Sequence, residues 1–392
     1  MTAPTTYRVC SPRSRMRRHD ARGYRVMLQD NTSVLDLALD VQPDPREFIR
    51  AAMDWHFNPA TGSPYWLKRA ESLAFDPRTD VESFEDLALF PNVADELREV
   101  PVQDLIPRGY GSHPEVVAVF ESGGTTGAPK RIVMLRDWWE RMLASQVASL
   151  DVRGVPADSN SLALAPSGPH MIGEIARQQA AARGGVRFAI DLDPRWVKKL
   201  IAAGRADEAD AYAEHLIDQA AFVLQTQDIR VIASTPPLLE RLAQRDDLVE
   251  LVRRKVQAIQ WAGAHMDEDT RRLLRTEVFP EVTLIGIYGS TMILGAVSER
   301  MDGGDDELCI FEPFSPYITF SVVDPDSGGT VAYGERGQVV MNHVSRSFLL
   351  PNNLERDTAI RIRPLGDHVG DAVADVAPVQ QFGDVTVIEG VY

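Results

Sequence analysis

Apolar residues recur at two different spacings along the chain, and the spacing changes near residue 116. Over residues 43–105 they recur at helical spacing between Pro, Gly and Asn, which predicts short helices joined by loops. After residue 116, compact apolar runs typical of buried strands alternate with helical stretches, the longest of which spans residues 194–227. The strand-like runs cover residues 116–120, 161–165, 186–190, 230–234, 258–262 and 283–287. Strands that alternate with helices in this way predict a parallel sheet with right-handed crossovers.

Beyond residue 300 the pattern changes again. Strand-like pieces at 318–323 and 337–341 are separated by turns rich in Asp, Gly and Pro, which predicts a strand-rich lobe. We therefore expect an α/β chain with four segments: a loosely ordered start at 1–42, an α/β core at 43–300, a β-rich lobe of the same unit at 301–381 and a hinge at 382–392.

The composition narrows the classes of partner. A chain of 392 residues with 44% hydrophobic residues can bury a large core. The 41 basic residues against 57 acidic ones leave a net charge of −16, which argues against a nucleic acid or an anionic membrane surface as the main partner. Cys10 and Cys309 form neither a disulfide framework nor a metal-ligand motif, so we expect a reducing, cytoplasmic compartment and predict no metal-ligating residues.

The segment after the first strand-like run carries the clearest chemical motif. It consists of Ser122, Gly123, Gly124, Thr125, Thr126, Gly127, Ala128, Pro129 and Lys130. Three glycines allow backbone N–H groups to approach a polyphosphate, the two threonines add hydroxyl donors, and the lysine adds a mobile cation. The segment lacks the closing Gly-Lys-Ser/Thr of a Walker A loop and the Gly-x-Gly-x-x-Gly spacing of dinucleotide-binding loops. It therefore predicts a phosphate-binding loop of another kind.

This loop resembles the phosphate-loop signature Ser/Thr-Ser-Gly-Thr-Thr-Gly-x-Pro-Lys of the adenylate-forming superfamily, which includes acyl- and aryl-CoA synthetases, peptide-synthetase adenylation domains and luciferases. Gly123 stands where the family has a second hydroxyl residue. Further segments similar to the family's motifs follow in its order, at residues 167–173, 261–265 and 288–291. The resemblance implies the fold of the family's large N-terminal domain, an α/β unit with a β-rich lobe, and ATP as the cofactor.

The resemblance also implies roles for individual residues. Those at the reacting phosphate and carboxylate would be Lys130, His170 and Thr291. Those around the nucleotide would be Ser122, Gly123, Gly124, Thr125, Thr126, Gly127, Gly263, Ala264, Tyr288, Gly289, Ser290 and Asp357. Those around the carboxylic acid would be Ser167, Gly168, His170 and Gly263. Asp357 stands where the family binds the ribose hydroxyls, Asp371 is an alternative for that role, and His265 replaces the family's usual acidic residue.

Two segments near the N-terminus narrow the resemblance. Residues 58–66 and the helix expected at 83–87 are similar to the phenylacetate-CoA ligase branch, and closest to adenylating proteins of phenazine-type antibiotic pathways that lack the small C-terminal domain. This likeness implies an aromatic or heteroaromatic carboxylic acid as the substrate. The acyl-AMP formed from it would pass to a separate partner, such as a reductase, an amine acceptor or a carrier protein.

Two departures from the family pattern bear on the chemistry. Met292 stands where the family has a Glu that helps to hold Mg²⁺ on the ATP phosphates, and a soft thioether cannot replace an oxygen ligand. Mg²⁺ would then be held by phosphates and water, or by an acid elsewhere. Residues 382–392 resemble the hinge before the family's small domain, which carries a catalytic lysine and shapes the thiol tunnel. We therefore expect acyl-AMP formation and not CoA thioester formation from this chain alone.

A second hypothesis belongs to a different class. The chain could be a binding protein derived from such an enzyme, which holds the aromatic acid and presents it to a partner. Met292 and the missing small domain favour this hypothesis. The retained Thr125, Thr126 and Asp357 favour an adenylating enzyme, which is the first hypothesis.

Overall fold

The structure is a computed structural model that describes residues 33–122, 128–301, 308–379, 381–382 and 385–386. The chain divides into two units, Met1–Ser33 and Val34–Tyr392, and the architecture described below is that of the second unit. None of the helices in the described part of the chain is long and apolar enough to cross a membrane.

The first part of this unit is helical, as predicted for residues 43–105. Its α-helices are α1 (Pro45–Phe57), α2 (Pro64–Ala70) and α3 (Pro77–Asp80). Short 3₁₀ turns lie at Val34–Asp36, Glu85–Leu89, Glu96–Arg98, Val102–Leu105 and Arg108–Tyr110. Each α-helix starts with a proline that follows Asp44, Ser63 or Asp76, whose side chain accepts backbone N–H groups of the first turn. The local sequence therefore determines where these helices begin.

A six-stranded sheet forms the centre of the next part, in the strand order β4-β3-β5-β6-β7-β8. Its strands are β3 (Ser161–Leu164), β4 (Arg187–Ala189), β5 (Val231–Ser234), β6 (Ala258–Trp261), β7 (Thr283–Ser290) and β8 (Gly295–Ser298). All neighbouring pairs are parallel except β7 and β8, which confirms the predicted parallel sheet. Strands β3, β5 and β6 are buried along their whole length, as expected for strands with helices on both faces.

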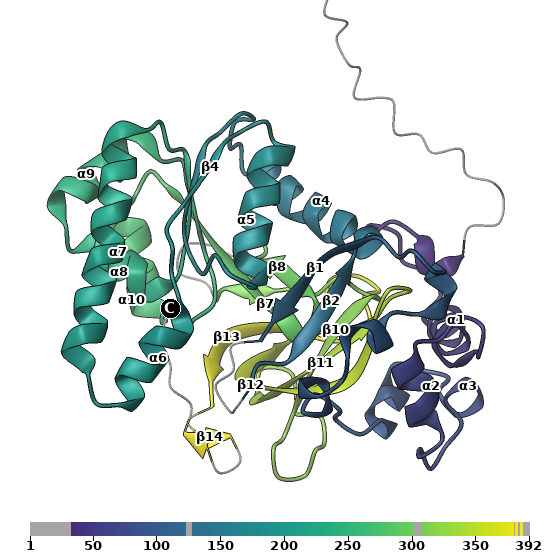
Figure 1. The fold of residues 1–392 in the computed structure, drawn as a ribbon. Helices are drawn as coiled ribbons and strands as arrows, with labels where there is room; N and C mark the ends of the chain where they lie inside the picture. The colour runs from purple at the N-terminus through teal and green to yellow at the C-terminus, as the bar shows by residue number, and fades with distance from the viewer. Residues whose placement is uncertain (1–32, 123–127, 302–307, 380, 383–384, 387–392) are drawn as a thin grey trace, which may run out of the picture. The chain divides into compact units, whose positions relative to one another are not determined.

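Helices connect these strands and cover both faces of the sheet (Figure 1). They are α4 (Arg136–Val152), α5 (Met171–Ala182), α6 (Pro194–Ala202), α7 (Ala206–Thr226), α8 (Pro236–Ala243), α9 (Asp246–Lys255) and α10 (Glu268–Leu273), which runs into a π-helical turn at Leu274–Val278. Helix α5 lies on one face and α7 to α10 lie on the other (Figure 1), an arrangement that right-handed crossovers produce for this strand order. The helical stretch predicted for residues 194–227 consists of two helices, because Gly204, with a positive φ of 71°, separates α6 from α7.

The predicted strand at residues 116–120 lies outside the parallel sheet. It forms β1 (Val116–Glu121), which pairs antiparallel with β2 (Arg131–Leu135), a strand that the sequence pattern does not predict. Glu121 and Arg131 are partners in this pairing. The predicted phosphate-binding loop is therefore the connection of a β-hairpin.

The β-rich lobe contains a five-stranded antiparallel sheet in the order β10-β11-β12-β13-β9. Its strands are β9 (Ile310–Phe311), β10 (Ile318–Val323), β11 (Arg336–Val344), β12 (Leu349–Ile362) and β13 (Ala372–Pro378), and a separate pair is formed by β14 (Gln381–Phe382) and β15 (Val385–Thr386). The predicted pieces at 318–323 and 337–341 correspond to β10 and to part of β11.

The pairing of β11 with β12 contains a bulge. Gln338 pairs with Thr358, but Val340 pairs with Leu354, so an advance of two residues on β11 matches four on β12. Residues 355–357 lie within this bulge. A bulge turns side chains away from the regular alternation of a strand, and bulges often lie next to functional sites.

Two tryptophans, the partly buried Trp55 and the buried Trp138, join the helical part to both sheets. Trp55 on α1 donates its indole N–H to the carbonyl oxygen of Arg346 at 2.8 Å. Trp138 on α4 donates to the carbonyl oxygen of Leu294 at 2.8 Å, and its ring lies edge-on to that of His343 on β11, with centroids 4.6 Å apart. Each ring buries apolar area while its polar atom has a partner, so these contacts hold α1, α4 and the two sheets together.

Candidate functional site

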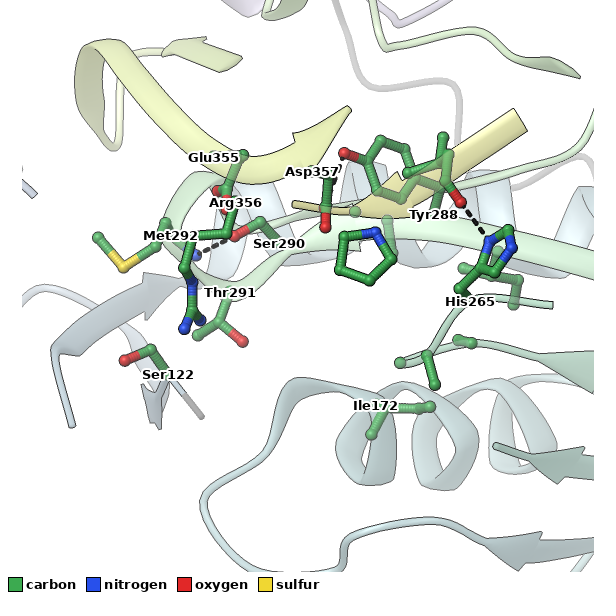
Figure 2. Close-up of a pocket in the computed structure, with 18 of the residues that line it drawn as sticks. Ser122, Ile172, His265, Tyr288, Ser290, Thr291, Met292, Glu355, Arg356 and Asp357 are labelled. Atoms are coloured by element: carbon green, nitrogen blue, oxygen red, sulfur yellow. Dashed lines mark hydrogen bonds between the residues drawn. The ribbon is translucent and has the colours of Figure 1, made fainter. Parts of the chain in front are cut away.

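A cavity of about 660 Å³ lies between the carboxyl ends of the parallel strands and the strands β12 and β13 (Figure 2). We call residues 261–266 and 287–292 the β6–β7 wall, and residues 353–357 and 375–378 the β12–β13 wall. Open parallel sheets bind ligands at the carboxyl ends of their strands. The predicted site residues that line this cavity are Ser122, Lys130, His170, Gly263, Ala264, Tyr288, Gly289, Ser290, Thr291 and Asp357. The other predicted loop residues lie outside the described part of the chain; they are Gly123, Gly124, Thr125, Thr126 and Gly127.

The turn after β6 contributes mainly backbone to the cavity. Gly263 has a positive φ of 85°, a conformation that glycine adopts without strain. His265 holds the turn in place, because its Nδ1 atom lies 2.6 Å from the carbonyl oxygen of Val376 on β13. This histidine therefore connects the two walls, and Gly263 and Ala264 present their peptide groups to the cavity.

The end of β7 is fixed by two local contacts. A methyl group at Gly289 would lie 2.0 Å from the carbonyl oxygen of Gly295, so β7 and β8 can approach this closely only with glycine here. The Ser290 hydroxyl accepts the N–H of Met292 at 3.2 Å and caps the 3₁₀ turn that starts at Thr291. These contacts hold Thr291 at the cavity (Figure 2).

Tyr288 and Asp357 form a second connection between the walls. The Tyr288 hydroxyl donates to the Asp357 carboxylate at 3.1 Å, and its ring packs against Phe311 and Phe320, with centroids 5.4 and 5.7 Å away. Burial raises the pKa of Tyr288 well above its ordinary value, and the negative charges of Asp357 and Glu355 raise it further. The phenol is therefore protonated at neutral pH and remains a donor to the carboxylate.

The alternative candidate, Asp371, lies elsewhere. Its buried carboxylate accepts from the Arg361 guanidinium at 2.8 Å and from the N–H of Val322 at 3.3 Å. Burial raises the pKa of Asp371, although Arg361 acts in the opposite direction. Asp371 serves the packing of the antiparallel sheet, and of the two aspartates only Asp357 lines the cavity.

Ser122 and Lys130 close the base of the predicted phosphate-binding loop. The N–H of Ser122 donates to the carbonyl oxygen of Lys130 at 3.0 Å, and the Ser122 hydroxyl accepts the N–H of Lys130 at 3.0 Å. The Lys130 ammonium group lies 3.2 Å from the carboxylate of Asp95, which also pairs with Arg98 at 3.1 Å. Asp95 therefore holds the lysine at the cavity, where 18% of its side chain is exposed.

His170 lies at the start of α5, beside a charged cluster. Burial lowers the pKa of its ring, and the positive charge of Arg195 lowers it further. Arg195 forms an ion pair with Glu121, which also pairs with Arg131 at 2.9 Å. A neutral imidazole donates one hydrogen bond and accepts one. His170 can therefore orient a carboxylate by a hydrogen bond and not by charge.

Ser167 and Gly168 lie outside the cavity lining. The Ser167 hydroxyl donates to the carboxylate of Asp191 at 3.0 Å, and the Gly168 carbonyl accepts the N–H of His170 at 2.7 Å. Both residues make internal contacts that position the start of α5, and their contact with the acid stays a prediction.

The charged residues next to Asp357 belong to none of the motifs that the sequence indicates. Glu355 and Arg356 line the cavity with it, because the bulge in β12 brings neighbouring side chains to the same space. In a regular strand, neighbouring side chains point to opposite faces. The one sequence signal that could have indicated Arg356 is its position directly before Asp357.

A buried carboxylate forms another part of the cavity's surroundings. Glu299 accepts from Cys309 at 2.8 Å and from Arg271 at 3.0 Å, and both of these partners line the cavity. Burial raises the pKa of the Cys309 thiol, and the negative charge of Glu299 adds to this effect. Because the three groups satisfy one another, we assign them a structural role beside β8.

No protein-family model matches the chain, and no curated protein matches it in sequence. Its fold is similar to solved structures of 2-hydroxyisobutyryl-CoA ligase. For the ligase in the postadenylation state in complex with R3-HIB-AMP, the TM-score is 0.57 at 15% identity, and the match covers 84% of this chain and 66% of the ligase chain. For the ligase in complex with 2-HIB-AMP and CoA in the thioesterification state, the TM-score is 0.57 at 18% identity. This match covers 87% of this chain and 68% of the ligase chain.

The chain therefore spans about two thirds of the length of these ligase chains. Likeness at this level of identity concerns the fold. The chain has the mixed α/β fold of the large N-terminal domain of adenylate-forming ligases, which confirms the predicted fold class.

Proposed function

We propose that this protein is an ATP-dependent enzyme that adenylates a carboxylic acid in the cavity between the β6–β7 and β12–β13 walls. One observation carries the proposal: the same cavity is lined by Ser122 and Lys130 at the base of the hairpin loop, by Thr291 after β7 and by Asp357 on β12. These residues are far apart in the chain, and the family resemblance assigns them to one nucleotide. Ligases of this fold have been solved in complex with 2-HIB-AMP, which supports the same chemistry here.

Acyl-AMP formation is an in-line substitution at phosphorus. A carboxylate oxygen attacks the α-phosphorus of ATP, the bond to the bridging oxygen breaks, and pyrophosphate leaves with the electron pair. Because both reactants are anions, the site must align them and supply positive potential. Lys130 would contact the β- and γ-phosphates, and Thr291 the α-phosphate. Asp357 would accept from the ribose hydroxyls, while Tyr288 and the peptide at Gly263 would pack along the adenine.

The acid would bind against an apolar part of the cavity. This part of the cavity is lined by apolar residues of α5 and of the segment after β7. They are Met171, Ile172 and Ile175 on α5, and Met292 and Ala296 after β7. A surface of this kind suits an aromatic or heteroaromatic acid, in agreement with the resemblance to the phenylacetate-CoA ligase branch. The neutral ring of His170 would hydrogen-bond the carboxylate. The acyl-AMP would then pass to a separate reductase, amine acceptor or carrier protein.

The described residues do not form a magnesium site of their own. Among them, no group of three or more His, Cys, Asp or Glu side chains is arranged to hold a metal ion. Met292 is buried at the position where the family has an acid, and Glu121, the acid beside Ser122, is already paired with Arg131 and Arg195. Positive charge held by protein side chains therefore becomes more important at this site.

Carboxylate-dependent ATP–pyrophosphate exchange tests the proposal, with benzoic, naphthoic, anthranilic and phenazine carboxylic acids as candidate substrates. We expect exchange with one of these acids. Lys130→Ala should slow it by about 100-fold, because a cation on the phosphates is lost, while binding of the acid alone stays nearly unchanged. Thr126→Ala should act in the same direction. No exchange with any acid, at protein concentrations that would reveal very slow turnover, would contradict an adenylating enzyme.

The binding-protein hypothesis keeps one observation in its favour, the buried Met292 in place of an acid. It predicts saturable binding of the aromatic acid, no exchange, and no effect of Lys130→Ala. The same set of measurements therefore separates the two functions.

A further inference from the structure

Arg356 lies in the β12 bulge, and its side chain extends into the cavity towards Thr291 and Ser122 (Figure 2). Its Nη1 atom is buried and has no hydrogen-bond partner among the described residues. Leaving a buried charged donor unsatisfied is costly, so such a group indicates an acceptor that the protein itself does not supply.

Arg361, on the same strand, shows the contrast. Its guanidinium donates to the carboxylate of Asp371 at 2.8 Å and to the carbonyl oxygen of Val331 at 2.7 Å. These contacts stabilise the antiparallel sheet outside the cavity lining. Arg356 instead keeps a buried guanidinium nitrogen without an acceptor in the part of the chain that the structure describes.

Two further cations, Arg195 and Lys198 on α6, lie near this position. Burial lowers the pKa of Lys198 to about 8, and the positive charges of Arg356 and Arg195 contribute to the decrease, which places the three cations close together. Glu121 is shared between Arg195 and Arg131. The acids that flank Arg356 on β12, Glu355 and Asp357, accept from Asn353 at 2.7 Å and from Tyr288 at 3.1 Å. Clustered cations beside such a cavity attract an anion.

We propose that Arg356 binds a phosphate group of the nucleotide, as a second cation besides Lys130, with Arg195 and Lys198 adding positive potential. The inference rests on the proposed function, because it requires ATP in this cavity. A guanidinium fork can donate to two phosphate oxygens at once, and it is charged at every physiological pH. Arg356 thus supplies protein-held positive charge next to Thr291, in a cavity where Met292 replaces the expected acid.

Calorimetric titration of the full chain with ATP, AMP and adenosine, each in the presence of EDTA, tests this role. We expect Arg356→Gln to weaken ATP binding by about tenfold or more and to leave adenosine binding nearly unchanged. Arg356→Lys should recover part of the loss, because it keeps the charge but not the fork. Arg363→Gln is the matched control: Arg363 stacks on Tyr333, 4.2 Å from the ring centroid and outside the cavity lining, so ATP binding should not change.

The comparison of AMP with ATP shows which phosphate Arg356 contacts. If Arg356→Gln weakens the binding of both AMP and ATP, the contact is with the α-phosphate. If it weakens the binding of ATP alone, the contact is with the outer phosphates. Equal ATP affinity of the unaltered protein and Arg356→Gln would overturn the inference and leave the proposed function standing. Equal weakening of adenosine and ATP would also overturn it, because Arg356 would then support the fold or the nucleoside site. If the unaltered protein binds no ATP, the inference and the proposed function both fall.

Discussion

The two walls of the cavity offer a ligand different kinds of group. The β6–β7 wall presents peptide groups from two turns in addition to side chains, and Gly263 and Gly289 give these turns their backbone path. The β12–β13 wall presents the charged side chains of Glu355, Arg356 and Asp357 from a bulge in an antiparallel strand. The first wall depends on the path of the backbone, and the second on the identity of the side chains. Added atoms should therefore damage the first wall, whereas removed charges should damage the second.

Gly289→Ala should have the largest effect, because it adds atoms to the β6–β7 wall. The new methyl group would lie 2.0 Å from the carbonyl oxygen of Gly295 and 2.7 Å from the Cα of Ala296, so β7 and β8 would have to separate. We expect the free energy of unfolding, measured with urea, to fall by about 3 kcal/mol, and ATP binding to be lost. Gly329→Ala is the control, since a methyl group there would meet, among the described residues, the Ser327 hydroxyl alone, at 3.5 Å. Equal stability of the two variants would contradict this account of the wall.

Acidification should weaken the packing around the antiparallel sheet. Two buried histidines lie in this packing, one on α1 and one on β11, and both contact Ser345. Burial lowers the pKa of His56 to about 4 and that of His343 to about 3, whereas the described strands of the parallel sheet contain no histidine. In the unfolded chain a histidine binds its proton near pH 6.5. As the pH falls from 6.5 towards 4, the unfolded state therefore binds more protons and is favoured. Each histidine should remove about 1.4 kcal/mol of stability per pH unit in this window.

Urea unfolding between pH 7 and pH 4.5, followed by tryptophan fluorescence, measures this slope. Trp138 packs against His343 and reports on the same region. His343→Asn should lessen the slope by about 1.4 kcal/mol per pH unit, because its share of the proton uptake disappears. An unchanged slope in the variant would show that His343 does not carry the effect.

Asp357→Ala should weaken nucleotide binding without a comparable loss of stability. It removes the acceptor of the Tyr288 hydroxyl and, in the proposed function, the acceptor of the ribose hydroxyls. The loss of a charged acceptor corresponds to about 2 kcal/mol, or about 30-fold in ATP affinity. Asp357→Asn, which keeps an oxygen for Tyr288, should lose less. Asp371→Asn should have the opposite effect, a lower free energy of unfolding with unchanged ATP affinity. If instead the Asp371 variant lost ATP affinity and the Asp357 variant lost stability, the roles given to the two aspartates would be contradicted.

The β6–β7 wall could be predicted from the sequence because its turns follow directly on buried strands. Residues 261–265 and 288–291 are contiguous segments, and the carboxyl ends of parallel strands meet at one edge of a sheet. The hairpin loop at 122–130 has the same local character, although its return strand, β2, is a run of only four apolar residues after Arg131 and is not predicted. The break at Gly204 is harder to predict, since a lone glycine in a helical pattern does not by itself end a helix.

The β12–β13 wall could be predicted only in outline, because its geometry depends on long-range pairing. Arg356 reaches the cavity only because Gln338 and Val340 on β11 pair with residues four apart on β12, and no local signal predicts this register. The choice between Asp357 and Asp371 likewise depends on the folded chain. The strand pattern predicts a β-rich lobe here, but not which of its side chains face a ligand.

Raising the pH should produce the smallest effect, and it acts on Lys198 of α6, whose charge interacts with that of Arg356 in the β12–β13 wall. Lys198 has a pKa of about 8, lowered by burial and by the charges of Arg356 and Arg195, so it is charged at pH 7 and largely neutral at pH 9. As that charge is lost, ATP affinity should fall by about threefold, a modest change because Lys198 is not part of the cavity lining and acts on the nucleotide only at a distance. Burial keeps the pKa values of Tyr288 and Cys309 above this range, so neither contributes.

Lys198→Met separates this effect from others that depend on pH. At pH 7.5 the variant should bind ATP as weakly as the unaltered protein does at pH 9, and its affinity should then stay constant between the two. The His170 ring does not interfere, because burial lowers its pKa and it is already neutral at pH 7.5. A pH dependence that persists in the variant would assign the titration to another group. The positive charge that acts on the nucleotide would then be confined to Arg356 and Lys130, without a contribution from α6.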